Sequence, residues 1–166
     1  MALTVTTDRV ADLFKAVDQL VKSKVLVGIP DTGAERTPEE GEKGPPISNA
    51  QIGYLMEHGA PEIGLPARAT LIPGIEKAQE KITYHLGSAA LAAVLGDAGS
   101  VETSLMKAGT VAVSSVQAEI TDGTFAPLSE RTIKARLRRG RTSDKPLIDS
   151  GQFRRSITYV VIRRGS

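Results

Sequence analysis

The residue types that most often carry enzyme chemistry are scarce in this chain. It has no cysteine, and its two histidines, His58 and His85, lie 27 positions apart. The missing cysteines exclude a disulfide scaffold, a thiolate zinc site and a cysteine nucleophile. The histidine spacing shows neither a metal-ligand cluster nor a histidine-based triad. We therefore expect no metal ion and no cofactor.

Two short motifs contain residues that act together in other catalytic sites. Glu57 precedes His58, but neighbours on a helix point about 100° apart and do not converge on one atom. Asp149-Ser150 precedes Gly151 without an accompanying base, a combination typical of turns in which Asp and Ser accept backbone N–H groups. Phosphate-binding glycine loops and nucleophile elbows are absent. We expect no catalytic residues and no enzyme activity.

The charges are divided unevenly along the chain. The C-terminal segment 131–166 carries eleven Lys and Arg against two Asp, whereas 1–130 carries ten against seventeen Asp and Glu. Such a basic segment contacts nucleic-acid phosphates or an acidic protein surface, and both interpretations stay open beside a simple solvated face. The basic residues expected to bind a partner are Arg131, Lys134, Arg136, Arg138, Arg139, Arg141, Arg154 and Arg155.

The segment 31–46 is rich in Gly, Pro and Glu and shows no hydrophobic periodicity. We expect a flexible acidic loop, which is long for a connection inside a compact domain. Either it is a solvated linker or it orders on assembly. In the second case its partner-binding residues are Glu35, Glu39, Glu40 and Glu42.

The hydrophobic pattern predicts four or five helices and a small sheet. The 166 residues fit one domain, 1–166, of the α+β class. We expect a small, mainly antiparallel sheet packed with a long helix hairpin and shorter helices. The predicted helices are 8–23, 48–59, 73–96, 100–122 and 130–139, and the predicted strands are 24–29 and 156–164, the second a central strand.

Capping and turn residues set most of these boundaries. Asp8, Ser48, Ser100 and Ser129 are expected N-caps, Ser48 as part of a capping box with Gln51. The expected structural turns contain Gly59, Pro66, Asp149 and Gly151. The α-helix 8–23 is predicted from the spacing of Val10, Leu13, Phe14, Val17, Leu20 and Val21.

Four segments together resemble a known family. They are Tyr54–Gly59 (YLMEHG), Pro66–Leu71 (PARATL), Phe125–Ser129 (FAPLS) followed by Thr132–Arg136 (TIKAR), and Pro146–Ile157 (PLIDSGQFRRSI). In this order they are similar to the tail-completion, or neck, proteins of tailed bacteriophages, including the Mu-like virion-morphogenesis proteins. The resemblance covers about residues 20–164.

The resemblance implies a structural protein rather than an enzyme. It implies a virion component at the head–tail joint, made in the cytoplasm of the bacterial host and not associated with a membrane. Its partners would be further copies of itself in a ring of six, the tail terminator, the head-closure or connector proteins, and double-stranded DNA in the lumen. The alternative is an accessory or assembly protein that binds double-stranded nucleic acid through the basic segment 131–155.

Overall fold

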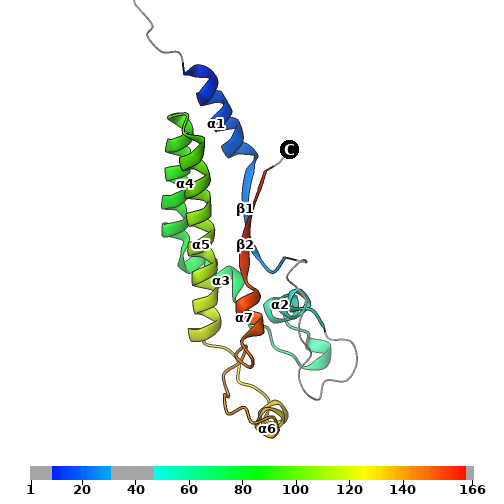
Figure 1. Ribbon diagram of the computed structural model, residues 1–166. Helices are drawn as coiled ribbons and strands as arrows, with labels where there is room; N and C mark the ends of the chain where they lie inside the picture. The colour runs from blue at the N-terminus through cyan, green and yellow to red at the C-terminus, as the bar shows by residue number, and fades with distance from the viewer. Residues whose placement is uncertain (1–8, 31–46, 164–166) are drawn as a thin grey trace, which may run out of the picture. The chain divides into compact units, whose positions relative to one another are not determined.

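The computed structural model describes residues 9–30 and 47–163, so the expected cap Asp8 and the acidic loop 31–46 lie outside the described residues. The described residues have an α+β fold with an antiparallel two-stranded sheet, as predicted. Figure 1 shows the elements, which are α1 (Val10–Lys22), β1 (Ser23–Gly28), α2 (Asn49–His58), the 3-10 helix η2 (Pro61–Ile63), α3 (Leu71–Lys77), α4 (Gln79–Val94), α5 (Ala98–Asp122), α6 (Glu130–Arg138), α7 (Gln152–Ser156) and β2 (Thr158–Arg163).

The chain divides into two compact units, each assembled from segments that are distant in sequence. The division falls inside α5 and inside both strands. The described residues of unit 1 are 9–26, 79–111 and 160–163, and those of unit 2 are 27–30, 47–78 and 112–159.

Unit 1 is built from α1, α4, the first half of α5 and one end of the sheet. Its buried core contains Ala16 from α1, Ala89 and Ala93 from α4, and Val101 and Leu105 from α5. Four of the six buried core residues are alanine, so the helices can approach closely, as the alanine-rich stretch of α4 predicts. Figure 1 shows α4 and the first half of α5 side by side as a hairpin.

Unit 2 has larger residues in its core. Val116 and Ile120 from the second half of α5 pack with Phe153 of α7 and with Ile157. The helix α3 lies so close to α5 that a Cβ on Gly74 would be 2.7 Å from the Val116 Cα. Only glycine allows this approach, because a methyl group would collide with the backbone of α5.

The two strands pair with each other, and their side chains alternate between a half-buried and an exposed face. In unit 1, Val25 and Val161 pack on the core. Within the described residues β2 has β1 as its sole neighbour, so the prediction of a central strand is wrong there. Its apolar run leaves Val160 and Ile162 on the exposed face.

Two predicted helix caps are confirmed. Ser48 and Gln51 form the capping box, with the Ser48 N–H donating to Gln51 Oε1 at 2.8 Å. The Ser129 Oγ accepts a hydrogen bond from the Thr132 N–H and begins α6. Both signals lie within four residues, which is why the sequence reveals them.

The predicted cap Ser100 is wrong, because α5 already begins at Ala98. The carboxylate of Asp97 accepts the Ser100 N–H at 3.0 Å and its hydroxyl at 2.7 Å. These two hydrogen bonds, the one to the backbone first, lower the pKa of Asp97 because they favour its charged form.

Two further boundaries differ from the prediction. The helix expected over 73–96 is interrupted at Ala78, whose φ of −100° and ψ of 4° separate α3 from α4. The strand expected from Ser156 starts at Thr158, because residues 152–156 form α7. Phe153 holds this single turn by inserting into the core of unit 2.

Candidate functional site

Glu57, at the end of α2, holds the start of α3. Its carboxylate accepts backbone hydrogen bonds from Thr70 at 2.8 Å, Leu71 at 3.1 Å and Ile72 at 3.1 Å. These N–H groups belong to the first turn of a helix, where no intrahelical acceptor exists and a negative charge is favoured. Glu57 therefore joins the YLMEHG and PARATL segments.

Arg68 joins the second segment to the third. Only 6% of the residue is exposed, and its guanidinium donates from Nε to the Ala126 carbonyl and from Nη2 to the Pro127 carbonyl, both at 3.0 Å. Burial, and then the positive charge of Arg136, lower the pKa of Arg68. The sequence gives no local signal for this role, because the acceptors lie 58 and 59 positions away.

Arg136 joins the TIKAR segment to the loop that follows α6. Its Nη1 donates to the carbonyls of Ser143, Lys145 and Ile148 at 3.1, 2.8 and 3.0 Å. Its Nε lies 3.8 Å from the Asp149 Oδ1. The residue is 8% exposed, so the prediction that Arg136 presents its charge to a partner is wrong.

The loop fixed by Arg136 contains strained backbone. Leu147 has a φ of 63°, a left-handed conformation that costs a non-glycine residue about 1 kcal/mol or more. The Asp149 Oδ2 forms a 2.5 Å ion pair with Arg141 on the same loop. Gly151, with a φ of 76°, then turns the chain into α7. Asp149 and Gly151 thus lie in the structural turn that the sequence indicates.

Gly59 is the other glycine with an unusual backbone. Gly59 lies in the structural turn that the sequence predicts; its φ of 74° is positive, but its ψ of −179° places it outside the left-handed helical region. A Cβ there would lie 2.8 Å from the Ala67 nitrogen. Pro66 is exposed beside this turn.

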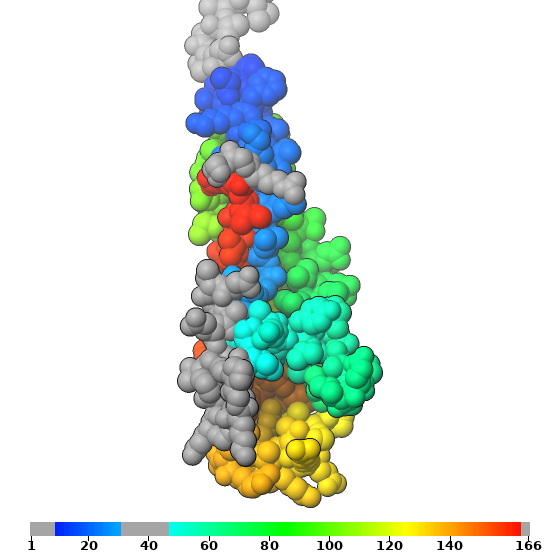
Figure 2. Space-filling view, turned by 90° about the vertical axis from the view of Figure 1, so that its right-hand side faces the viewer, coloured from blue at the N-terminus to red at the C-terminus, as the bar shows by residue number. Residues whose placement is uncertain are grey.

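These clamped segments surround a pocket of about 720 Å³ in unit 2. Figure 2 shows a recess between α2 (cyan) and α6 (yellow) on this side of the molecule. The polar lining includes Arg68, Arg136, Asp149 and Asn49, whose Oδ1 is buried without a hydrogen-bond partner. The apolar lining is formed by Ile47, Ile52, Met56, Leu65, Pro66, Pro127, Leu128, Leu147 and Phe153.

The chemistry of this pocket is that of a structural clamp. Its arginines already bind carbonyl groups, and no lining residue is a histidine, cysteine or lysine. Among the described residues no group of three His, Asp or Glu could hold a metal ion. The arrangement holds four segments of backbone in place and supplies no acid–base pair.

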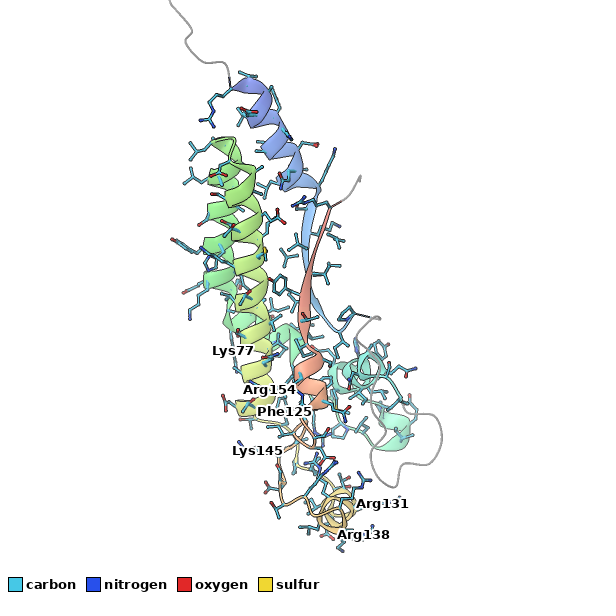
Figure 3. All side chains as sticks on the ribbon, viewed as in Figure 1. Lys77, Phe125, Arg131, Arg138, Lys145 and Arg154 are labelled. Atoms are coloured by element: carbon cyan, nitrogen blue, oxygen red, sulfur yellow. The ribbon has the colours of Figure 1, made fainter. Side chains whose placement is uncertain are left out.

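The remaining basic residues of the predicted surface lie in two places. Arg131, Lys134 and Arg138 are exposed on α6, and Figure 3 shows Arg131 and Arg138 projecting from it. Lys134 is 3.5 Å from the Glu130 carboxylate one turn earlier. Arg139 follows the helix and is also exposed.

Arg154 and Arg155 are exposed on α7 but also take part in the fold of unit 2. The Arg154 Nε donates to the Gln117 carbonyl at 3.2 Å, and the Arg155 Nη2 donates to the Ser150 carbonyl at 3.2 Å. The predicted acidic partners, Glu35, Glu39, Glu40 and Glu42, lie in the loop outside the described residues.

The sequence analysis missed a second surface, on unit 1. The apolar pattern of α1 predicts a helix correctly, yet Phe14 is 68% exposed and Val21 is 77% exposed. On α4, Val94 is 62% exposed. A periodic apolar pattern identifies the face that avoids water but not the molecule that covers it.

Comparisons of the chain with protein-family models, curated proteins and solved structures find no match. The likeness to phage neck proteins therefore rests on the four sequence segments alone. No described helix has the length and apolar character needed to cross a bilayer.

Proposed function

We propose that this chain is a structural protein of a bacteriophage virion. In this proposal it completes the tail at the head–tail joint, as a neck protein that forms a ring between the tail terminator and the head-closure proteins. The six-fold ring comes from the family resemblance. The surface of unit 1 is the observation that carries the proposal.

Unit 1 exposes more large apolar side chains than unit 2. Of the nineteen exposed large apolar side chains among the described residues, thirteen belong to unit 1, although it has fewer described residues than unit 2. Large exposed apolar patches mark sites of protein–protein contact. A subunit of a permanent assembly has such a surface, because assembly buries it.

Unit 2 supports the same proposal in a different way. Glu57, Arg68 and Arg136 connect the four family-like segments through backbone hydrogen bonds. Residues in the family-like segments therefore hold loops together in this fold. This is the role expected of signature residues in a structural protein.

The direct test is a count of copies in the particle. Virions purified from the source phage are digested, and peptides of this chain are quantified against the portal and major tail proteins. About six copies per particle are expected from the ring proposal. Absence of the chain from complete virions would overturn it.

A second candidate function is binding of double-stranded nucleic acid through the segment 131–155. The observation that favours it is the exposed cationic face of α6, formed by Arg131, Lys134 and Arg138. Binding of a labelled duplex should weaken steeply with salt. Changing these three residues to Gln should abolish it, and no binding by the wild type at low salt would exclude this function.

A further inference from the structure

The first surface is an apolar stripe on α1. Its members are spaced by four, three and four residues, which places side chains on one helix face. They are Val10, Phe14, Val17 and Val21. Their exposed fractions are 54%, 68%, 37% and 77%. The neighbouring face of α1 buries Ala16 in the core of unit 1. The apolar face of α1 is therefore wider than the part of it that packs on the core of unit 1.

The second surface is a stripe on α4 with the same spacing. Tyr84, Ser88 and Leu91 lie on α4, and Leu95 follows its last residue. Tyr84, Leu91 and Leu95 are 72%, 62% and 61% exposed. The core alanines of α4 point to another side of the helix, so this stripe too lacks a cover within unit 1.

The two stripes match when α1 and α4 run antiparallel. Each extends over twelve residues, roughly 16 Å of helix. In the register that places Val10 opposite Leu95, the same alignment puts Phe14 opposite Leu91, Val17 opposite Ser88 and Val21 opposite Tyr84. Large apolar side chains of the two helices then face each other at three positions, and the small Ser88 leaves room for Val17 at the fourth.

One pair of opposite charges at one end of the stripes is compatible with this register, although Lys81 lies beside Glu80 on α4. Lys24, exposed on β1, lies three residues after Val21, and Glu80, exposed on α4, lies four residues before Tyr84. Antiparallel packing brings these opposite charges to the same end of the contact. Such rim charges give orientation to an interface more than they add affinity.

We propose that α1 of one copy packs antiparallel against α4 of the next copy in this register. The α1 stripe of one copy is therefore covered by the α4 stripe of a second copy of this chain. The inference rests on the proposed function, because a ring requires two different patches on each subunit that meet head to tail. In a closed ring every copy uses both stripes, and none remains exposed.

The outer face of the sheet in unit 1 also exposes apolar side chains. Leu26, Val160 and Ile162 are exposed by 51%, 42% and 38%, and Leu26 follows α1 by four residues. A stable interface buries about 800 Å² on each partner, which involves some 20–30 residues. Two stripes alone are smaller than this, so the contact includes the sheet face beside α1.

Disulfide cross-linking tests the register, because the chain has no cysteine of its own. The variants Phe14→Cys and Leu91→Cys are prepared separately, mixed in equal amounts at a concentration where the wild type assembles, and oxidised mildly. We expect a covalent dimer linked between positions 14 and 91 in the mixture, and no dimer from either variant alone. Ile63→Cys, at a position 76% exposed in unit 2, is the matched control and should link to neither.

The cross-linking results test the α1–α4 contact separately from the proposed function. Links between two copies of position 14, or two of position 91, would overturn the α1–α4 contact. An assembled protein without a 14–91 link, or a chain that stays monomeric and unlinked at every concentration, would also overturn it. The proposed function fails separately, through absence of the chain from virions.

Discussion

The two units distribute their apolar side chains in opposite ways. Unit 1 buries mostly alanine and exposes Phe14, Leu91 and other large residues, whereas unit 2 buries Ile120 and Phe153. Apolar burial is the main stabilising term of a fold. Unit 2 therefore obtains its stability within the chain, and in our proposal unit 1 buries its exposed apolar residues by packing against another copy.

The units also differ in their use of buried polar groups. The four buried polar or charged residues among the described residues, Asn49, Arg68, Thr70 and Arg136, all belong to unit 2. Buried charges are tolerated when hydrogen bonds satisfy them, and they then fix one arrangement of the backbone. In our proposal unit 2 is the rigid support and unit 1 is the assembly surface.

The largest change in stability is expected from Arg136→Met. The substitution leaves three carbonyl groups without their donor, removes the Arg136 contact of the Asp149 Oδ1 and releases the strained Leu147. We expect a loss of about 3 kcal/mol in the free energy of unfolding. Urea denaturation measures it, with Arg138→Met on the exposed face of α6 as the control. Equal stabilities of the two variants would contradict the clamp.

Phe14→Glu should break assembly without breaking the fold. A charge in the middle of the α1 stripe is expected to weaken subunit affinity about 100-fold, the effect of losing an interface hot spot. The free energy of unfolding of the monomer should change by less than about 0.5 kcal/mol, because residue 14 is exposed. Sedimentation velocity measures the affinity.

Ile63→Glu, on an equally exposed residue of unit 2, is the control for Phe14→Glu. It should assemble like the wild type. If both variants weaken assembly equally, the contrast between the units is wrong.

Glycine-to-alanine changes should have opposite signs in the two units. Gly74→Ala in unit 2 forces α3 away from Val116 and should lower stability by about 2 kcal/mol. Gly87 lies on α4 in unit 1 with no atom within 4 Å of an added Cβ. Gly87→Ala should therefore raise stability by about 0.5 kcal/mol. Thermal unfolding compares them, and a neutral Gly74→Ala would disprove the close helix contact.

The smallest effect is expected at Asp97, the cap of α5 in unit 1. Asp97→Ala removes the acceptor of the Ser100 N–H and should lower the melting temperature slightly at neutral pH. Hydrogen bonds lower the pKa of Asp97 in the folded chain, so its contribution is present above the unfolded pKa of about 4 and disappears as pH falls through the folded value. A difference in melting temperature that persists in strong acid would contradict this cause.

The parts of the fold that the sequence predicts are those with local signals. The capping box at Ser48 and the helix start at Ser129 both depend on residues within a few positions of one another. The clamps at Glu57 and Arg68 depend on contacts across 13 to 59 positions, so only the folded chain reveals them.

The basic segment illustrates the same limit. Arg136 and Arg138 are two residues apart and look equivalent in sequence, yet one is buried and the other is exposed. Their roles differ because the loop 143–149 folds back over one side of α6. Composition identifies a charged segment. Only the packing of the folded chain distinguishes Arg136, which holds the fold, from Arg138, which is exposed.

Hydrogen exchange in the dilute and the assembled protein tests the contrast between the units most directly. Exchange slows where assembly suppresses local opening. The account predicts slower exchange over residues 10–21 and 84–95 of unit 1 on assembly, and unchanged exchange over α6 and α7 of unit 2. Protection confined to unit 2, or no change in either stripe, would contradict the claim that unit 1 is the surface through which this chain assembles.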